Sequence, residues 1–226
     1  MALILSIETS TNVCSAALHQ EGTPIASSLH EVEKSHSSLL PGIALEICQS
    51  AGKTMRMLDA VAISSGPGSY TGLRIGISTA KGFAFTLGIP LIAVPTMEVL
   101  LEAVRGKFKG AHNLCAMMDA RRMEVYTMME DENGKVLWDT QAKILDSNAF
   151  ASFAAPTHLF GNGMPKFREI NQQENLIFIE GIVPDAVNMG RIALEKYLEE
   201  KFEDVAYFEP NYLKEWQTTI PKNKLV

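Results

Sequence analysis

The sequence predicts an α/β fold in two lobes, each a mixed sheet that opens with a three-strand meander and is accompanied by helices. Short apolar runs bounded by turn residues indicate strands, and they alternate with runs whose apolar residues recur at helical spacing. The second half repeats the element order of the first, with a meander followed by helix–strand alternation. The halves share no sequence repeat, so the duplication is inferred from element order alone.

The first half starts with three short strands joined by polar turns, which is typical of an antiparallel meander. A helix with one apolar stripe follows and ends at Gly52. The expected strands cover residues 3–7, 13–18, 24–29, 60–63 and 89–94, and the expected helices cover 37–51, 71–87 and 96–105.

The chain is organised around residues 59–88, a strand followed by a glycine-rich turn and a glycine-bearing helix. Gly66 and Gly68 flank a proline in the turn, and Ser69 or Thr71 is a candidate N-cap. Free N–H groups at such a helix start attract phosphate or carboxylate. The Lys-Ser/Thr pair of a Walker-type loop is absent, so a tight connection within the domain is the favoured interpretation.

Gly72, Gly76 and Gly82 lie inside the expected helix, where each costs about 1 kcal/mol relative to alanine. That cost suggests the close approach of another backbone. Packing within the same lobe and contact with a second protein are both open at this point.

The second half begins where residues 106–111 turn polar and glycine-bearing, which predicts lobes at 1–108 and 109–226. The tail from residue 211 either packs back on the first lobe or serves as an arm for a partner. The expected strands cover residues 114–118, 124–129, 135–138, 158–160 and 176–179, and the expected helices cover 148–153 and a run capped by Asp185 that ends near residue 201.

Composition and charge narrow the class of protein. The 226 residues carry a net charge of −6, which argues against this chain alone cradling a nucleic acid. Three distant cysteines fit a reducing compartment. No targeting peptide is evident, and no apolar run approaches the roughly 18 residues of a membrane span. We therefore expect a soluble cytoplasmic protein.

Without any comparison to known families, the sequence shows no complete set of catalytic residues. The five histidines lack metal-ligand spacing, and the Gly-x-Ser-x-Gly elbow of a hydrolase is absent. Glu8 is the best acid candidate, because strand ends open onto clefts in this fold class. Asp119 and Arg121 end a later strand, either as a solvated turn with a local ion pair or as groups facing a cleft.

Several motifs together resemble the TsaB family of bacterial tRNA-modification proteins, over nearly the full chain. The most specific is Gly-Pro-Gly-Ser-Tyr-Thr-Gly-Leu-Arg at residues 66–74. The others are Ile-Glu-Thr-Ser-Thr at 7–11, His-Ser-Ser-Leu-Leu-Pro at 36–41, Asp-Ala-Arg at 119–121 with Glu-Val-Tyr at 124–126, Phe-Gly-Asn-Gly at 160–163 and Glu-Pro-Asn-Tyr-Leu at 209–213.

The resemblance implies the two-lobed fold of the actin, sugar-kinase and Hsp70 ATPase superfamily, with a shortened second lobe. It implies a role in making N6-threonylcarbamoyladenosine beside the tRNA anticodon. TsaD, the related catalytic subunit, would be the partner, and the ATPase TsaE would assist. A TsaB protein would act as a non-catalytic activator that meets tRNA indirectly, and it would pair with TsaD or with a second copy of itself.

The resemblance also implies that this chain has lost a metal site. TsaD carries a metal-binding segment His-Met-Glu-Gly-His, and the segment of this sequence that resembles it is Thr-Met-Glu-Val-Leu at residues 96–100. Leucine cannot coordinate a metal, and one hydroxyl replaces two imidazoles poorly. Glu8 also stands where the family commonly has aspartate. We therefore expect no metal and no cofactor of its own, with ATP or ADP at most at the level of the complex.

Two groups of candidate residues follow from these arguments. The expected partner-binding residues are His36, Leu39, Leu40, Ile43, Ile47, Gly72, Arg74, Ile75 and Gly76. The expected cleft or phosphate-facing residues are Glu8, Thr9, Ser10, Gly66, Gly68, Ser69, Asp119 and Arg121. The competing hypotheses are a nucleotide-dependent enzyme of the same fold and a metallopeptidase-like protein.

Overall fold

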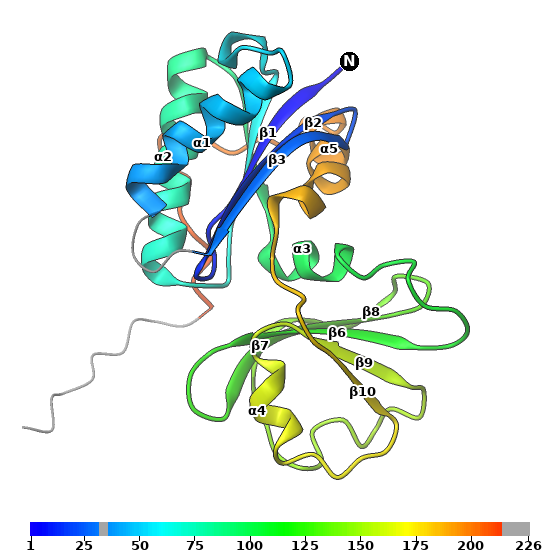
Figure 1. The fold of residues 1–226 in the computed structure, drawn as a ribbon. Coiled ribbons are helices and arrows are strands. Elements are labelled where there is room, and N and C mark those ends of the chain that lie inside the picture. Colours follow the sequence, from blue (N-terminus) through cyan, green and yellow to red (C-terminus); the bar gives the residue numbers. More distant parts are fainter. Residues whose placement is uncertain (32–35, 214–226) are drawn as a thin grey trace, which may run out of the picture.

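The computed structural model describes residues 1–31 and 36–213, with no side-chain description for residues 36–38. Two five-stranded sheets lie one beyond the other, with helices around the first and between the two (Figure 1). Their strand orders are β3-β2-β1-β4-β5 and β8-β7-β6-β9-β10, so the second sheet repeats the topology of the first. The predicted α/β class is confirmed, and the duplication is confirmed for the order of the strands.

In the first sheet, β1, β2 and β3 form an antiparallel meander, and β4 and β5 run parallel to β1. Side chains of β1 alternate between two apolar layers: Leu3, Leu5 and Ile7 face one core cluster, and Ile4 faces the other. The strands are β1 (Leu3–Glu8), β2 (Val13–Gln20), β3 (Thr23–Glu31), β4 (Ala60–Ser64) and β5 (Leu91–Val94).

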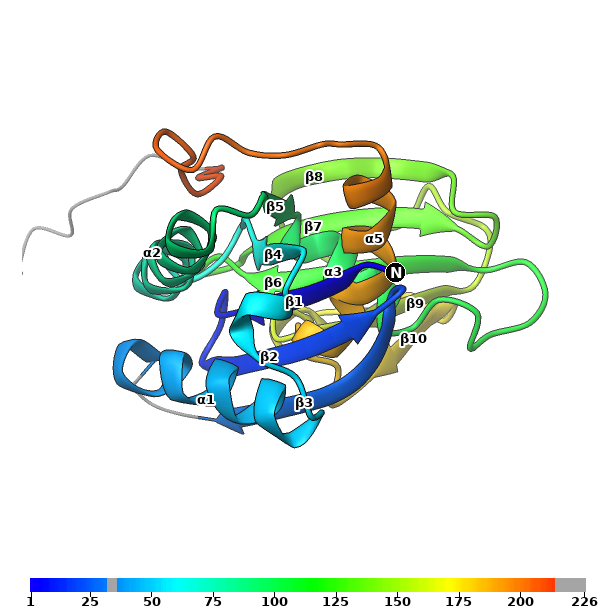
Figure 2. The same ribbon diagram turned by 90° about the horizontal axis from the view of Figure 1, so that it is seen from above.

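Helices α1 and α2 cover one face of this sheet, and η2 and α5 cover the other, as the view from above also shows (Figure 2). Of the two candidate caps, Ser69 is the one that caps α2, by accepting from the Gly72 N–H at 3.2 Å. Gly88 ends that helix, as predicted, and is in the left-handed conformation. The elements are α1 (His36–Ser50), η1 (Met55–Met57), α2 (Tyr70–Leu87), η2 (Ala186–Met189) and α5 (Gly190–Leu198).

The second sheet has its own apolar cluster on one face, which includes α4, and packs its other face on α3. Helix α3 therefore lies between the sheets (Figure 1). The elements are α3 (Thr96–Glu102), β6 (Asn113–Asp119), β7 (Glu124–Asp131), β8 (Val136–Ile144), β9 (Thr157–Phe160), α4 (Met164–Arg168) and β10 (Leu176–Ile179).

The expected helix at residues 148–153 is wrong. The N–H groups of Ala151 and Phe153 each donate three residues back, to the carbonyls of Asn148 and Phe150, which makes successive turns. Phe150 and Phe153 both pack on Trp138, with ring centroids 5.1 Å away in each case. The aromatic contacts, rather than helical hydrogen bonding, fix this segment.

The chain returns to the first sheet after β10. Helix α5, predicted as part of the second half, packs on β1 and β5. Beyond it, the Lys81 ammonium donates to the carbonyls of Ala206 and Phe208 at 3.0 and 3.1 Å. The N–H of Asn211 donates to the Ser65 carbonyl at 2.7 Å. The described start of the tail thus lies along α2, residues 214–226 fall outside the described part, and the lobe division at 108/109 stays a prediction.

None of the helices in the described part of the chain has both the length and the apolar character needed to cross a membrane.

Candidate functional site: two strand-end turns and a helical face

The turn after β1 is buried and packed against the start of α2. The Thr9 hydroxyl donates to the Gly72 carbonyl at 2.9 Å. A Cβ on Gly72 would lie 2.1 Å from the Thr9 carbonyl oxygen, and one on Gly76 equally close to the Thr9 hydroxyl. The cost of these two helical glycines is therefore explained by packing within the lobe, whereas a Cβ on Gly82 would meet nothing within 4 Å.

The glycine-rich turn at residues 66–69 packs against the turn after β1. The Ser69 N–H donates to the Ser10 carbonyl at 2.6 Å, and a Cβ on Gly68 would clash with Ser10. Gly66, at φ +108°, faces the carbonyl of Asn211. Because the N–H groups of Ser69 and Gly72 already have acceptors, the structure favours the tight-connection interpretation of this turn. Its phosphate-facing role stays a prediction.

Glu8 ends β1 with its side chain fully buried. One carboxyl oxygen accepts from the Ser10 N–H, and the other has no hydrogen-bond partner in the described part of the chain. Burial raises the pKa of Glu8 from 4.5 to about 7, against the opposing hydrogen bonds from Ser10 and Ser64. Burial thus favours the protonated form of Glu8 and disfavours a fixed negative charge at this position.

The equivalent turn of the second lobe, after β6, is exposed. Lys166 donates to the carboxylate of Asp119 and to the carbonyl oxygens of Arg122 and Glu124. Arg121 and Arg122 take left-handed conformations, with φ of 70° and 49°. Burial alone would raise the pKa of Asp119, but the hydrogen bond and charge of Lys166 outweigh it and hold that pKa below its usual range. The turn is solvated, as one of the two predicted alternatives had it, but the cation that pairs with Asp119 is Lys166 of α4 rather than an arginine of the turn.

The structure thus brings six of the predicted cleft residues together in the first lobe and places Asp119 and Arg121 in a separate group in the second. No hydrogen bond or ion pair between residues of the described ranges joins Asp119 or Arg121 to the first-lobe group.

Most of the predicted partner-binding residues face the interior of the first lobe. Their burial follows from the helical stripes that α1 and α2 turn toward the sheet, so a partner cannot touch their side chains in this structure. The buried ones are Leu40, Ile43, Ile47, Gly72 and Gly76.

The remaining predicted partner-binding residues differ in their surroundings. The Arg74 guanidinium is exposed, but it donates to the Tyr212 hydroxyl at 3.1 Å and lies over the Tyr70 ring. Leu39 and Ile75 are partly exposed. The side chain of His36 lies outside the described part of the structure. The partner role of these four stays a prediction.

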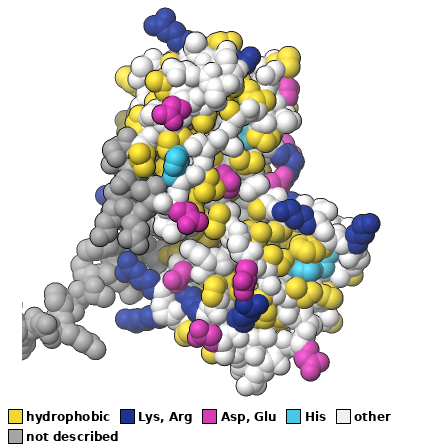
Figure 3. All heavy atoms as spheres, in the orientation of Figure 1, with side chains coloured by type: hydrophobic (Ala, Val, Ile, Leu, Met, Phe, Trp, Pro, Cys, Tyr) yellow, Lys and Arg dark blue, Asp and Glu magenta, His cyan; other side chains and the backbone are white. Residues whose placement is uncertain are grey.

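An apolar groove of about 500 Å³ lies along α1 and α2. Gly82 leaves it open because no side chain fills the space above that position. Phe85 stands on the same helix with 82% of its surface exposed, and Leu45 on α1 is about half exposed. Figure 3 shows hydrophobic side chains on the α1 side of the upper lobe. The groove is lined by Pro41, Met55, Thr79, Gly82, Phe83, Thr86 and Leu87.

Sequence reasoning missed this groove because it followed the longest apolar stripe of each helix, which is the buried one. A signal was present. Leu45 and Phe85 are large apolar residues off those stripes. A single exposed apolar residue is ordinary, but one on each of two neighbouring helices indicates an apolar surface.

Helix α3 holds the segment where the metal-ligand pattern was expected to be lost. Thr96 and Leu100 are both buried, and Leu100 belongs to the core cluster between α3 and the second sheet. Across the described residues, no group of three or more His, Cys, Asp and Glu side chains is placed to hold a metal ion.

The sequence is similar to those of several known proteins. A family model described as "TsaD: tRNA N6-adenosine threonylcarbamoyltransferase" matches residues 30–208. The tRNA threonylcarbamoyladenosine biosynthesis protein TsaB of Escherichia coli (strain K12) is 30% identical over 221 residues, covering 93% of this chain and 94% of that protein. TsaB of Bacillus subtilis (strain 168) is 36% identical over 133 residues, covering 58% of this chain and 56% of that protein.

Solved structures agree over the whole fold. YeaZ from Pseudomonas aeruginosa has a TM-score of 0.80 at 27% identity, covering 94% of this chain and 100% of that one. An uncharacterized P. aeruginosa protein "with similarity to peptidase YEAZ" has a TM-score of 0.82 at 25% identity, covering 95% and 100%. With a family model matched over most of its length and a relative 30% identical across nearly all of both chains, this chain belongs to the TsaB family of tRNA threonylcarbamoyladenosine biosynthesis proteins.

Proposed function

We propose that this chain is a non-catalytic partner subunit of the machinery that makes N6-threonylcarbamoyladenosine in tRNA. Its partner is the catalytic subunit TsaD, which it binds and activates through α1 and α2 of the first lobe. Membership of the TsaB family supports the biochemical setting, and the helical face supports the mode of action.

The observations that carry the proposal are the apolar groove along α1 and α2 and the exposed ring of Phe85 on α2. An aromatic ring that is 82% exposed gains from burial when a partner covers it, and aromatic anchors beside a pocket carry much of the binding energy at protein interfaces. The groove and the exposed ring lie on two rigid helices, so little ordering is needed on docking.

Two features support the absence of catalysis. The positions expected to have lost metal ligands, Thr96 and Leu100, point into the protein interior rather than to a site open to substrate. Glu8 is fully buried at the turn after β1, and burial raises its pKa to about 7. It is therefore poorly suited to hold a metal or a phosphate through a fixed negative charge.

The remaining parts of the proposal concern the setting. The complex acts in the cytoplasm, TsaE joins it, and any ATP or ADP is held at the level of the complex rather than by this chain. Most of the tRNA-binding surface belongs to TsaD, since this chain carries −6. In the absence of TsaD, a second copy of this chain occupies the same helical face.

The test is threonylcarbamoyl transfer to cognate tRNA, with this chain and its cognate TsaD assayed separately and together. We expect no transfer by this chain alone and transfer when both are present. Transfer by this chain alone would overturn the proposal.

A matched pair of variants locates the docking face. Phe85→Asp removes the exposed ring on α2, and Leu198→Asp makes the same kind of change at a residue of α5 that is 70% exposed. We expect the first to weaken TsaD binding by about 2 kcal/mol, roughly 30-fold in Kd, and the second to leave it unchanged. Equal effects of both variants would show that α2 is not the docking face.

A metallopeptidase-like protein is the competing candidate, because one similar structure is titled by its similarity to a peptidase. This hypothesis requires bound metal and chelator-sensitive proteolysis. Elemental analysis of the purified chain combined with a casein-cleavage assay decides the matter, and zinc with chelator-sensitive cleavage would favour the peptidase.

A further inference from the structure

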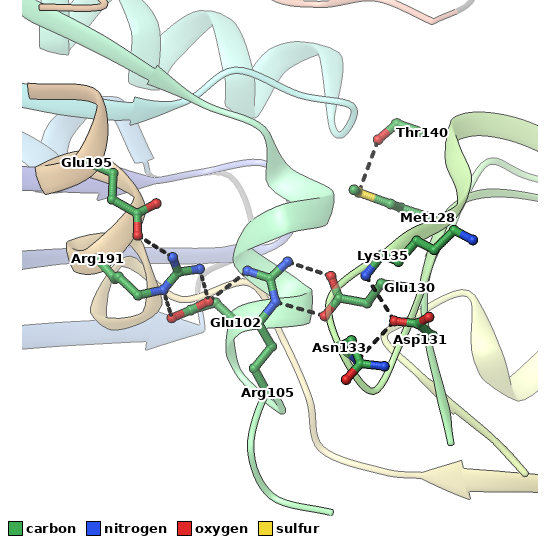
Figure 4. A network of polar contacts seen from close by, with 10 residues as sticks. All are labelled: Glu102, Arg105, Met128, Glu130, Asp131, Asn133, Lys135, Thr140, Arg191 and Glu195. Carbon is green, nitrogen blue, oxygen red and sulfur yellow. Dashed lines mark hydrogen bonds and ion pairs between the residues drawn. The ribbon is translucent and has the colours of Figure 1, made fainter. Parts of the chain in front are cut away.

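Five side chains of alternating charge run from one lobe to the other. Glu195 and Arg191 belong to α5, which packs on the first sheet, Glu102 ends α3, Arg105 follows that helix, and Glu130 lies on β7 of the second sheet (Figure 4). Each charge contacts the next one, so the row is continuous between the lobes.

The contact with the second lobe is bidentate. Arg105 donates through Nε to Oε1 of Glu130 at 2.8 Å and through Nη2 to Oε2 at 2.6 Å. Only 2% of the Glu130 side chain is exposed. A buried carboxylate strongly disfavours separation from its cation, and the fork geometry accepts one orientation.

The contact with the first lobe is made by Glu102, which binds Arg191 of α5. Its carboxylate accepts from Nη1 of Arg105 at 2.9 Å, and from Nε and Nη2 of Arg191 at 2.7 Å each. Burial alone would raise the pKa of Glu102, but the hydrogen bonds and charges of Arg191 and Arg105 lower it. Glu102 therefore stays ionised and joins the two arginines through one carboxylate.

The covalent connections and the apolar packing between the lobes constrain the angle between them less strictly than these ion pairs do. The chain passes to the second sheet through α3 and residues 103–112 and returns through residues 180–185. Helix α3 contacts both lobes through apolar side chains, Val99 toward the first and Leu100 toward the second. Apolar contact is non-directional, so it permits small rotations that a bidentate ion pair does not.

We propose that this row of charges is an interlobe latch that holds the second lobe at one angle to the first, with Arg105 making its contact to the second lobe. The latch is a conformational device of the chain itself and does not depend on the proposed function. Releasing Arg105 from Glu130, or Arg191 from Glu102, frees the second lobe to rotate about α3.

The test is the distance between spin labels, one on each lobe, measured by pulsed electron paramagnetic resonance on the full chain. Gln49 on α1 and Glu169 after α4 are exposed and suit substitution by cysteine. The native thiols of Cys14, Cys48 and Cys115 are all buried, and burial raises the pKa of each, so the label reacts at the introduced positions.

The decisive variant is Arg105→Met with Glu130→Met, which removes the buried carboxylate together with its cation and so leaves neither of the two unpaired. We expect one narrow distance peak in the unaltered protein and loss of that peak to a broad distribution in the double variant. Circular dichroism and thermal melting establish that the double variant is folded. If it fails to fold, Glu102→Gln with Arg191→Met tests the other contact of the latch, with the same broadening expected.

Glu195→Gln is the control, because it changes only the half-exposed end of the row, and the peak should stay narrow. A narrow peak at an unchanged distance in a folded latch variant would overturn the proposal and assign the lobe angle to the apolar packing of α3. Broadening in Glu195→Gln as large as in the double variant would also contradict it.

Discussion

The two lobes share one sheet topology but use it differently. In the first, the connections flanking β4 are long helices, α1 and α2, which build an outer face with an apolar groove. In the second, the corresponding connections are a series of turns before β9 and the five-residue helix α4 after it. A repeated sheet therefore supplies the framework, and the lengths of its connections decide which lobe has an outer helical face with an apolar groove.

The turns after the first strand of each lobe differ in the same way. The turn at residues 9–12 is packed against glycines of α2. The turn at residues 120–123 is exposed, and Lys166 donates a hydrogen bond to its Arg122 carbonyl. In the first lobe, internal packing occupies the end of the sheet where a ligand would sit in an open α/β fold. This contrast is why the proposed function is placed on the outer helical face.

The largest expected effect tests the closed turn of the first lobe. Gly72→Ala places a methyl group where the Thr9 carbonyl oxygen lies, and backbone must move to admit it. We expect a loss of about 3 kcal/mol in the free energy of unfolding, measured by urea denaturation. Gly82→Ala is the control: nothing lies within 4 Å of that Cβ, so it should add about 1 kcal/mol through helix propensity.

The next effect concerns the carboxyl group sealed beneath that turn. The pKa of Glu8 is about 7 when folded and near 4.5 when unfolded, so the unfolded chain loses this proton first as pH rises. Stability falls between pH 4.5 and pH 7, and the contribution of Glu8 amounts to about 3 kcal/mol across that range. Urea unfolding of the unaltered protein and of Glu8→Gln, at pH 5 and pH 8, isolates this contribution.

If the difference in stability between the two proteins does not change with pH, Glu8 is ionised in the folded state. The first-lobe turn would then be open to water or to a ligand, and the contrast between the lobes would be lost.

A smaller effect is expected in the exposed turn of the second lobe. Lys166→Met removes the ammonium that joins Asp119 to the carbonyls of Arg122 and Glu124, at a cost of about 2 kcal/mol. The pKa of Asp119 should rise toward its ordinary value, because its cation is gone. Carboxyl-carbon NMR measures this pKa, and an unchanged value would show that Lys166 does not organise the turn.

The smallest effect concerns backbone strain in the same turn. Arg121 has φ of 70°, a conformation that glycine adopts without steric cost. Arg121→Gly should therefore raise the free energy of unfolding by about 1 kcal/mol. A loss of stability would show that the arginine side chain supports the turn through its own contacts.

Much of the fold was predictable because it depends on local patterns. The apolar runs of the strands, the Ser69 cap and the Gly88 helix end all specify structure within a few residues. The turns at residues 148–153 were mistaken for a helix because their aromatic residues pack on Trp138, which is ten or more residues away in the sequence. Non-local contacts of this kind leave no periodic signal.

The candidate site was harder to predict for the same reason. The sequence shows that Gly72 and Gly76 need a close neighbour, but not that the neighbour is Thr9, more than sixty residues earlier. Leu40, Ile43 and Ile47 form the clearest stripe of α1, and that clarity marks the core rather than a docking surface. The sequence carries no pattern for Arg105 and Glu130, whose pairing depends on how the lobes are arranged.

The affinity of cognate TsaD for the unaltered chain and for Phe85→Asp, measured by isothermal titration, decides whether the α1–α2 face binds TsaD. We expect a saturable complex with the unaltered chain and roughly 30-fold weaker binding for the variant, with an unchanged melting temperature. Equal affinity of both proteins for TsaD would contradict the claim that the α1–α2 face is the functional surface of this chain.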